Sequence, residues 1–156
     1  MAVAAIVDTV AQRLNKAKLS EFEDGARRYI LWHFADTGRG PRIPEIQRHL
    51  QLASREDASA MLTKLHVVDL IVYDAAKASI AAAYPFSAKP TSHRVEIRNR
   101  TLHALCAIDA LGIPFMLDTP GQIRSECFWC HAAVEVDVAD GEIRAHRPAG
   151  LVAWYP

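Results

Sequence analysis

A change of hydrophobic period near residue 70 constrains the fold of this chain more than any other feature. Between residues 20 and 67, apolar side chains recur at helical spacing. From residue 70 onward the chain instead contains short runs typical of β-strands, such as LIVYD, SIAAAYPFS and HRVEI. Helices that come first and strands that follow predict an α+β protein.

The helical part has recognisable start and stop signals. The segment EFEDGARRYILWHFADTG predicts a helix that ends at Gly38, and PEIQRHLQL predicts a short second helix. Ser54, with Asp57 three residues later, nearly matches a capping box and begins the third helix. Three helices followed by a β-hairpin predict a winged-helix-like domain, which we assign to residues 1–88.

A second unit is expected over residues 89–156, after the loop-like sequence AKPTS. It should be a small mixed domain of antiparallel strands and one helix, and that helix lies in LHALCAIDALGIPFML. The run IRSECFWC predicts a strand, and the ending LVAWYP is β-prone. The Asp-Gly pair at 140–141 predicts a hairpin turn. The strand before it alternates apolar and polar residues, with Val134, Val136 and Val138 on one face.

Composition argues against several classes of function. The 156 residues include 18 basic and 18 acidic side chains, so the chain as a whole has no electrostatic attraction for nucleic acid. The third helix offers only Arg55 and Lys64 as basic residues, and we do not expect DNA binding. No apolar run is long enough to cross a membrane.

The termini and cysteines predict a cytoplasmic protein. The N-terminal sequence MAVAAIVDTVAQRLNK is typical of a short amphipathic helix and not of a signal peptide. Three cysteines do not make a disulfide framework, which favours thiols that are buried, reactive or metal-bound.

Cys106 and Asp109 are the first candidate site residues. In a helix, residues three apart share a face, so the thiol and the carboxyl are expected to be neighbours that line a pocket. An ionisable group in an apolar stretch is costly unless it is paired or used. Two interpretations stay open: a functional pair, or a small buried side chain beside a carboxylate that caps or hydrogen-bonds nearby groups.

The sequence CFWCH at 127–131 is the second candidate. Two cysteines at this spacing at a hairpin can present both sulfurs to one metal ion, but a structural zinc site needs two further ligands. The available donors in this half are Cys106, His131 and His146, with His93 and His103. The same pattern occurs in c-type haem attachment, which requires export, and in thioredoxin-like pairs, which require a following helix.

These segments together resemble the alkylmercury (organomercurial) lyases. The runs AYPFSAKPTSHRVEI, LHALCAIDALGIPFML, IRSECFWC and VEVDV carry the resemblance, which extends over roughly residues 20–154. Its most specific part is C-A-x-D-A-L followed by a cysteine-bearing hairpin. The resemblance implies an N-terminal winged-helix-like domain, a C-terminal domain with the active site, and an enzyme that cleaves carbon–mercury bonds.

The resemblance also implies roles for individual residues. Cys106 would bind mercury, Asp109 would work with it in proton transfer, and Cys127 would be mainly structural. These roles are chemically reasonable, because soft thiolates are good ligands for thiophilic metals and a carboxyl in apolar surroundings retains its proton to higher pH. Such a carboxyl can protonate the carbon and release the hydrocarbon.

One feature of the family has no counterpart in this chain. The lyases use a second mercury-binding cysteine downstream of the part that matches LVAWYP, and the sequence ends at Pro156. The resemblance therefore allows a truncated chain, a shortened homologue without that step, or a second thiolate supplied by Cys127 or Cys130.

Two other functions remain as alternatives to the lyase. One is a non-catalytic protein that binds mercury, zinc or copper at Cys106, Cys127 and Cys130; the other is a metal-sensing winged-helix regulator. The lyase interpretation requires no cofactor, because mercury enters as substrate and leaves as product; zinc is the other ion considered. The expected partners are a small organometallic substrate and cellular thiols. The sequence indicates no oligomeric state.

Overall fold

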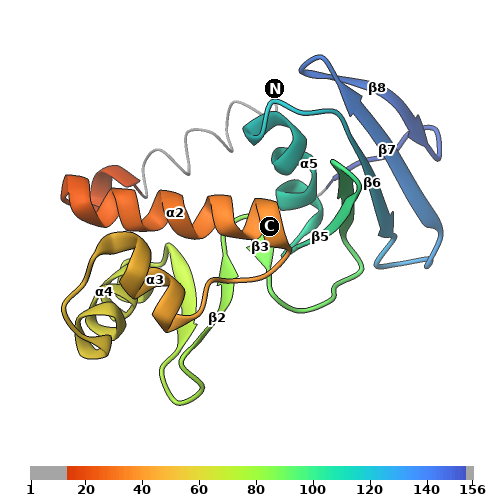
Figure 1. Cartoon of the computed structure of the whole chain (residues 1–156). Helices are drawn as coiled ribbons and strands as arrows, with labels where there is room; N and C mark the ends of the chain where they lie inside the picture. The colour runs from red at the N-terminus through yellow and green to blue at the C-terminus, as the bar shows by residue number, and fades with distance from the viewer. Residues whose placement is uncertain (1–13, 154–156) are drawn as a thin grey trace.

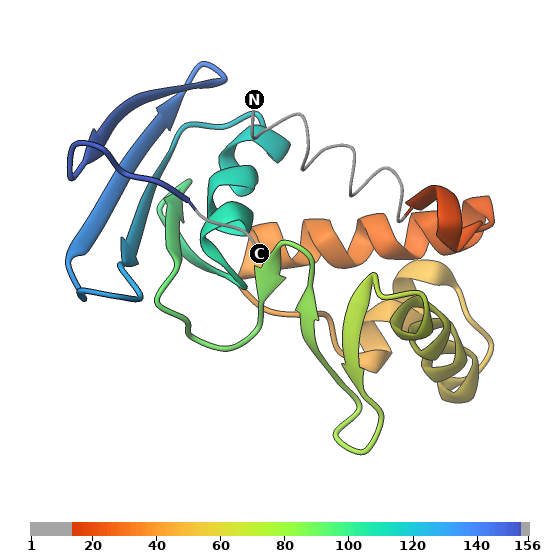
Figure 2. The ribbon, with the colours of Figure 1, turned by 180° about the vertical axis from the view of Figure 1, so that it is seen from behind.

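Residues 14–153 are described by the structure, a computed structural model, and they combine helices with a single antiparallel sheet (Figures 1 and 2). The α+β fold class expected from the sequence is confirmed. The predicted N-terminal helix lies mostly outside the described residues, as do the last three residues of LVAWYP. Residues 151–153 of that run are not in a strand.

After helical residues 14–17, the first part of the described chain contains α2 (Glu21–Thr37), α3 (Ile43–Leu50) and α4 (Arg55–Val67). Gly38 ends α2 in the left-handed conformation with φ 73°, as predicted. Ser54 and Asp57 form the predicted capping box of α4. In Figure 1, α3 and α4 lie below α2, and Lys64 of α4 forms an ion pair with Glu23 of α2.

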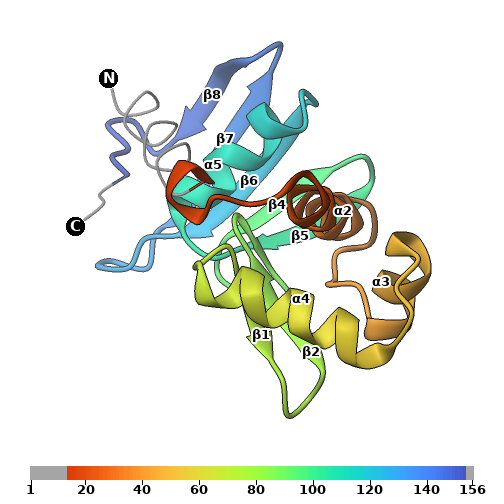
Figure 3. The same ribbon diagram turned by 90° about the vertical axis from the view of Figure 1, so that its left-hand side faces the viewer.

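Eight strands form the sheet in the order β1-β2-β3-β5-β4-β6-β7-β8, and every neighbouring pair is antiparallel. Their bounds are β1 (Ile71–Asp74), β2 (Ser79–Ala83), β3 (Phe86–Ser87), β4 (Arg94–Ile97), β5 (Arg100–Ala104), β6 (Gly121–Glu126), β7 (Ala133–Ala139) and β8 (Glu142–Arg147). One further helix, α5 (Ala107–Met116), packs beside β4, β5 and β6 (Figure 3).

The sheet and core continue from the helical part into the thiol-bearing part. β3 pairs with β5 so that Phe86 lies opposite Ala104, and the Phe86 ring stacks on Phe34 of α2 with ring centroids 5.8 Å apart. Strands on either side of residue 88 therefore share one sheet. The winged-helix assignment and the division into residues 1–88 and 89–156 stay predictions, although the order of three helices and the β1–β2 hairpin is the expected one.

The hairpin of β7 and β8 follows its local sequence signals. Asp140 and Gly141 adopt positive φ values of 52° and 69°, which a tight hairpin turn requires. Val136 and Val138 are buried on one face of β7, as their alternation predicts. The strand predicted over IRSECFWC is shorter than expected, because β6 ends at Glu126 and the chain turns there.

No helix within residues 14–153 is both long enough and apolar enough to cross a membrane.

Candidate functional site

The end of β5 is held in place by three hydrogen bonds from outside the strand. The Ala104 N–H donates to the His93 carbonyl at 3.0 Å, and the Thr91 hydroxyl donates to the Ala104 carbonyl at 2.8 Å. The next N–H, of Leu105, donates to the Pro85 carbonyl at 3.3 Å. The backbone therefore leaves the sheet at a defined point, one residue before Cys106.

Cys106 is the N-cap of α5 and not a residue within a helix, which corrects the prediction of one helix through Cys106 and Asp109. Its backbone is extended, with φ −146° and ψ 176°, and its sulfur accepts a hydrogen bond from the Asp109 N–H at 3.4 Å. The physical reason is that residues 100–104 pair with β3 and β4, so the helix begins only at Ala107. The N-cap and the third helical residue are still neighbours, and the thiol and carboxyl meet as predicted.

Burial and Asp109 together make the Cys106 thiol a weaker acid. The pKa of this thiol is raised, chiefly because the half-buried side chain is withdrawn from water, and also because the Asp109 carboxyl hydrogen-bonds to it and carries negative charge. The N–H groups of Asp109 and Ile108 act in the opposite direction. The site therefore places a proton-bearing sulfur directly beside a carboxylate.

His93 lies near this pair. The sequence analysis named it only among the further donors available for a metal ion, and not as a residue of this site. In the register of the sheet it precedes β4, with Ala104 on one side and Ser125 on the other. Its Nδ1 lies 2.9 Å from the Ser125 hydroxyl. Burial lowers the pKa of His93, against the opposing charge of Asp109, which favours a neutral ring.

Cys127 and Cys130 lie at the turn between β6 and β7, as predicted. The Cys127 N–H donates to the Ala132 carbonyl at 2.9 Å, and the His131 N–H donates to the Cys127 carbonyl at 3.0 Å. Cys127 is half-buried and Cys130 is exposed. The pKa of Cys127 is lowered, chiefly by hydrogen bonds from the backbone N–H groups of Cys130 and Trp129 and then by the Cys130 side chain.

The three cysteines lie at the same end of the sheet. Among residues 14–153 they do not form one metal site. Cys106 follows β5 and Cys127 follows β6, and β4 lies between these two strands. No group of three His, Cys, Asp or Glu side chains that could hold a metal ion occurs in that part of the chain.

The histidines considered as further ligands have other partners. The His131 Nδ1 lies 2.6 Å from the Glu126 carboxylate, and the His146 Nδ1 lies 3.2 Å from the Pro148 carbonyl. The His103 Nδ1 accepts a hydrogen bond from the Thr91 N–H at 3.2 Å. None of these contacts joins a histidine to a cysteine.

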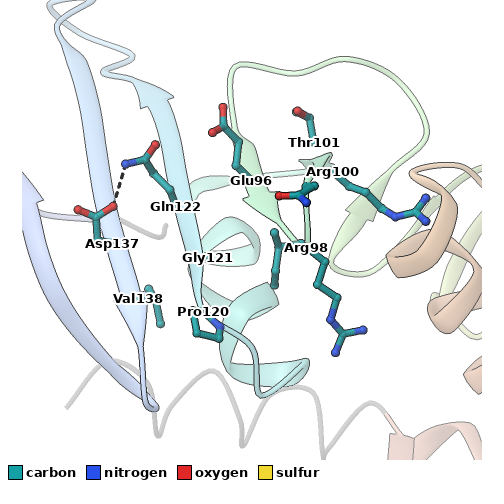
Figure 4. Close-up of a pocket in the computed structure, with 11 residues that line it drawn as sticks. Glu96, Arg98, Arg100, Thr101, Pro120, Gly121, Gln122, Asp137 and Val138 are labelled. Carbon is teal, nitrogen blue, oxygen red and sulfur yellow. Dashed lines mark hydrogen bonds between the residues drawn. The ribbon is translucent and has the colours of Figure 1, made fainter.

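A hollow lies at the opposite end of the same strands (Figure 4). It has a volume of about 680 Å³ and is lined by the turn between β4 and β5 and by the start of β6. A hydrogen bond of 2.9 Å from Gln122 to Asp137 crosses one of its walls. Cys106 and Asp109 do not line this hollow, so it is not the pocket that was expected around them.

The fold and the site together define an α+β protein that pairs a protonated thiol with a carboxylate at the start of a helix. Residues 86–156 match the family model described as "MerB: Alkylmercury lyase", and this range includes Cys106, Asp109, Cys127 and Cys130. The structure is also similar to one titled "Crystal structure of the mercury-bound form of MerB2". That match has a TM-score of 0.73 and 25% sequence identity and covers 85% of this chain.

These findings confirm the resemblance predicted from the sequence. Residues 86–156 are similar in sequence to the alkylmercury lyases, and most of the chain is similar in fold to the mercury-bound MerB2 structure. It spans 63% of the length of the mercury-bound MerB2 chain.

Proposed function

We propose that the protein is an organomercurial lyase that cleaves a carbon–mercury bond by protonating the carbon. The observation that supports this most directly is the contact between the half-buried Cys106 thiol and Asp109, within the region that matches the alkylmercury lyase model. A protonated thiol beside a carboxylate supplies both a soft ligand and the proton that the reaction needs.

In the proposed reaction, Cys106 first binds the mercury of an organomercurial cation. As the sulfur–mercury bond forms, the thiol proton moves to the Asp109 carboxylate. The helix cap keeps the two residues together, with the Cys106 sulfur 3.4 Å from the Asp109 backbone nitrogen. Asp109 then delivers that proton to the mercury-bound carbon. The carbon–mercury bond breaks, a hydrocarbon leaves, and Hg(II) stays on the Cys106 thiolate.

His93 has a positioning role in this proposal. Its Nδ1 contacts the Ser125 hydroxyl, and the charge of Asp109 raises the pKa of the ring against the larger effect of burial. A neutral imidazole that hydrogen-bonds to a hydroxyl is fixed in orientation, and it limits the directions in which the neighbouring carboxylate can turn. Asp109 would thereby stay directed at the thiol.

Cellular thiols complete the cycle by taking the product ion from Cys106. Mercury is substrate and product in this scheme, and no resident cofactor is part of it. Such a reaction suits the reducing cytoplasm, where small thiols are abundant.

Release of hydrocarbon from an organomercurial in the presence of excess small thiol tests the proposal. The wild-type protein should release hydrocarbon, and Cys106→Ser should release none, because the hydroxyl at the position beside Asp109 is a hard, weakly acidic ligand. Gas chromatography measures the product, and circular dichroism checks that the variant is folded. A wild-type protein that binds the organomercurial but releases no hydrocarbon would refute the lyase.

The alternative is a soft-metal-binding protein without catalysis. The turn with Cys127 and Cys130 favours it, because it carries two thiols, one of them exposed, without any contribution from Cys106.

A further inference from the structure

We propose that Cys127 and Cys130 form a second soft-metal site, separate from Cys106, which holds one thiophilic cation such as Hg(II) between two thiolates. The proposal depends on the geometry and chemistry of the turn between β6 and β7. It does not require the lyase reaction at Cys106.

The backbone of this turn brings the two cysteines together. The His131 N–H reaches back to the Cys127 carbonyl, four residues earlier, at 3.0 Å, which is the pattern of a single helical turn. In such a turn, side chains three residues apart are neighbours. The hydrogen bond from Cys127 to Ala132 at 2.9 Å closes the loop at its base and holds this arrangement on the end of the hairpin.

The Cys127 sulfur already has the second cysteine of the turn as a neighbour. Backbone N–H groups of Trp129 and Cys130 hydrogen-bond to the Cys127 sulfur, and the Cys130 side chain interacts with it directly. A sulfur that already has the second cysteine as its neighbour needs little rearrangement to share a cation with it.

The site is open to solvent. Cys130 is exposed, and the two residues between the cysteines are almost fully exposed, Phe128 at 96% and Trp129 at 89%. The loop that carries them projects from the end of the β6–β7 hairpin (Figure 3). Metal carried by a small thiol can therefore reach both sulfurs, and ligand exchange can proceed without opening the fold.

The donor set selects the kind of cation. Two thiolates satisfy Hg(II) or Cu(I), which are soft and accept two-coordinate linear geometry, whereas structural Zn(II) requires four ligands. Within residues 14–153 no third His, Cys, Asp or Glu joins the pair to make a metal-binding group. Binding of Hg(II) replaces both thiol protons, so one cation enters and two protons leave.

Retention of Hg(II) against a competing monothiol tests this site. The Cys106→Ser protein, which leaves only the Cys127–Cys130 pair, is dialysed with the Hg(II)–glutathione complex and bound mercury is measured by atomic absorption. It should retain one equivalent. Adding Cys130→Ser should weaken retention by roughly 10²–10⁴-fold, because one thiolate loses the advantage of intramolecular chelation.

Two further variants make the result specific. Adding Cys127→Ser to Cys106→Ser should weaken retention as Cys130→Ser does, whereas adding His131→Ala should leave it unchanged, because the His131 Nδ1 faces Glu126. Zn(II) in place of Hg(II) should not be retained. The proposal is overturned if Cys106→Ser retains no Hg(II), or if removing Cys130 leaves retention as it was. Neither outcome bears on hydrocarbon release by the wild-type protein, which tests the lyase separately.

Discussion

Cys106 and Cys127 leave the same end of one sheet, yet their surroundings affect the two thiols in opposite directions. Cys106 is half-buried at the start of α5 beside a carboxylate, and the pKa of its thiol is raised, chiefly by burial. Cys127 is at an open turn, where N–H groups of the following residues lower the pKa of its thiol. The same type of side chain therefore retains its proton more strongly at Cys106 than at Cys127.

The comparison shows that burial and a neighbouring charge separate the two thiols more than backbone hydrogen bonding does. Both sulfurs receive backbone N–H groups, so hydrogen bonding alone does not separate them. What differs is the desolvation of Cys106 and the carboxylate beside it. A retained proton suits protonation of carbon, and an accessible thiolate suits capture of a soft cation.

Replacing Asp109 should have the largest effect on the Cys106 side of this comparison. Asp109→Asn keeps the shape of the side chain but removes the carboxylate that receives and delivers the proton. Organomercurial should still bind through Cys106, whereas hydrocarbon release should fall by about 10²–10⁴-fold. Single-turnover release measured by gas chromatography gives the rate, and binding is followed separately by mass spectrometry.

The matched control for this change is Cys130→Ser at the exposed turn. Its rate of hydrocarbon release should stay within about twofold of the wild type, as for most exposed substitutions. Equal turnover by Asp109→Asn and the wild-type protein would remove Asp109 from the mechanism. A large loss in Cys130→Ser would instead show that the two thiol regions do not act separately.

Replacing His93 should have a smaller effect than replacing Asp109, because His93 acts through its neighbours. His93→Leu removes the contact of 2.9 Å with the Ser125 hydroxyl and should lower the rate of hydrocarbon release by roughly 10–100-fold, with organomercurial binding kept. His93→Gln, which retains a polar group for Ser125, should recover part of the rate. A merely structural role would predict equal loss of thermal stability in both variants and no such recovery.

The smallest expected effect is a difference in reactivity between the two thiols of the unsubstituted protein. Iodoacetamide reacts with thiolates, so Cys127 should be alkylated before Cys106 at neutral pH. Because the pKa of Cys127 is lowered and that of Cys106 raised, the reaction at Cys127 should begin at lower pH and that at Cys106 only at higher pH. Peptide mass spectrometry over a pH series measures both rates. The reverse order would contradict the electrostatic contrast between the two sites.

Sequence patterns within a few residues predicted much of the framework correctly. The stop of α2 at Gly38, the capping box of Ser54 with Asp57 and the turn at Asp140 and Gly141 were all expected and are all present. Each depends on the backbone preferences of neighbouring residues, which act over one turn of chain. The same local spacing also predicted the contact between Cys106 and Asp109.

The structure of the segment around that contact was not predicted, because strand pairing overrode helical spacing. Leu102 and Ala104 are fully buried on β5, which pairs with β3 on one side and β4 on the other. These partners lie elsewhere in the chain, and periodicity within LHALCAID contains no information about them. The helix therefore begins at Ala107, and Cys106 is its cap instead of a residue on its face.

The sequence by itself determined the fold class, the local caps and turns, the thiol–carboxylate pair and the family that the chain resembles, because these depend on residue type at short spacing. Only the tertiary structure decided that desolvation raises the pKa of the Cys106 thiol and that His93 meets Ser125 from 32 residues away. It also decided that Cys106 and Cys127 leave the sheet on either side of β4. Burial and strand register arise from contacts between distant segments. Those contacts bring chemically similar side chains into different electrostatic surroundings, and so give the two thiol regions their different chemistry.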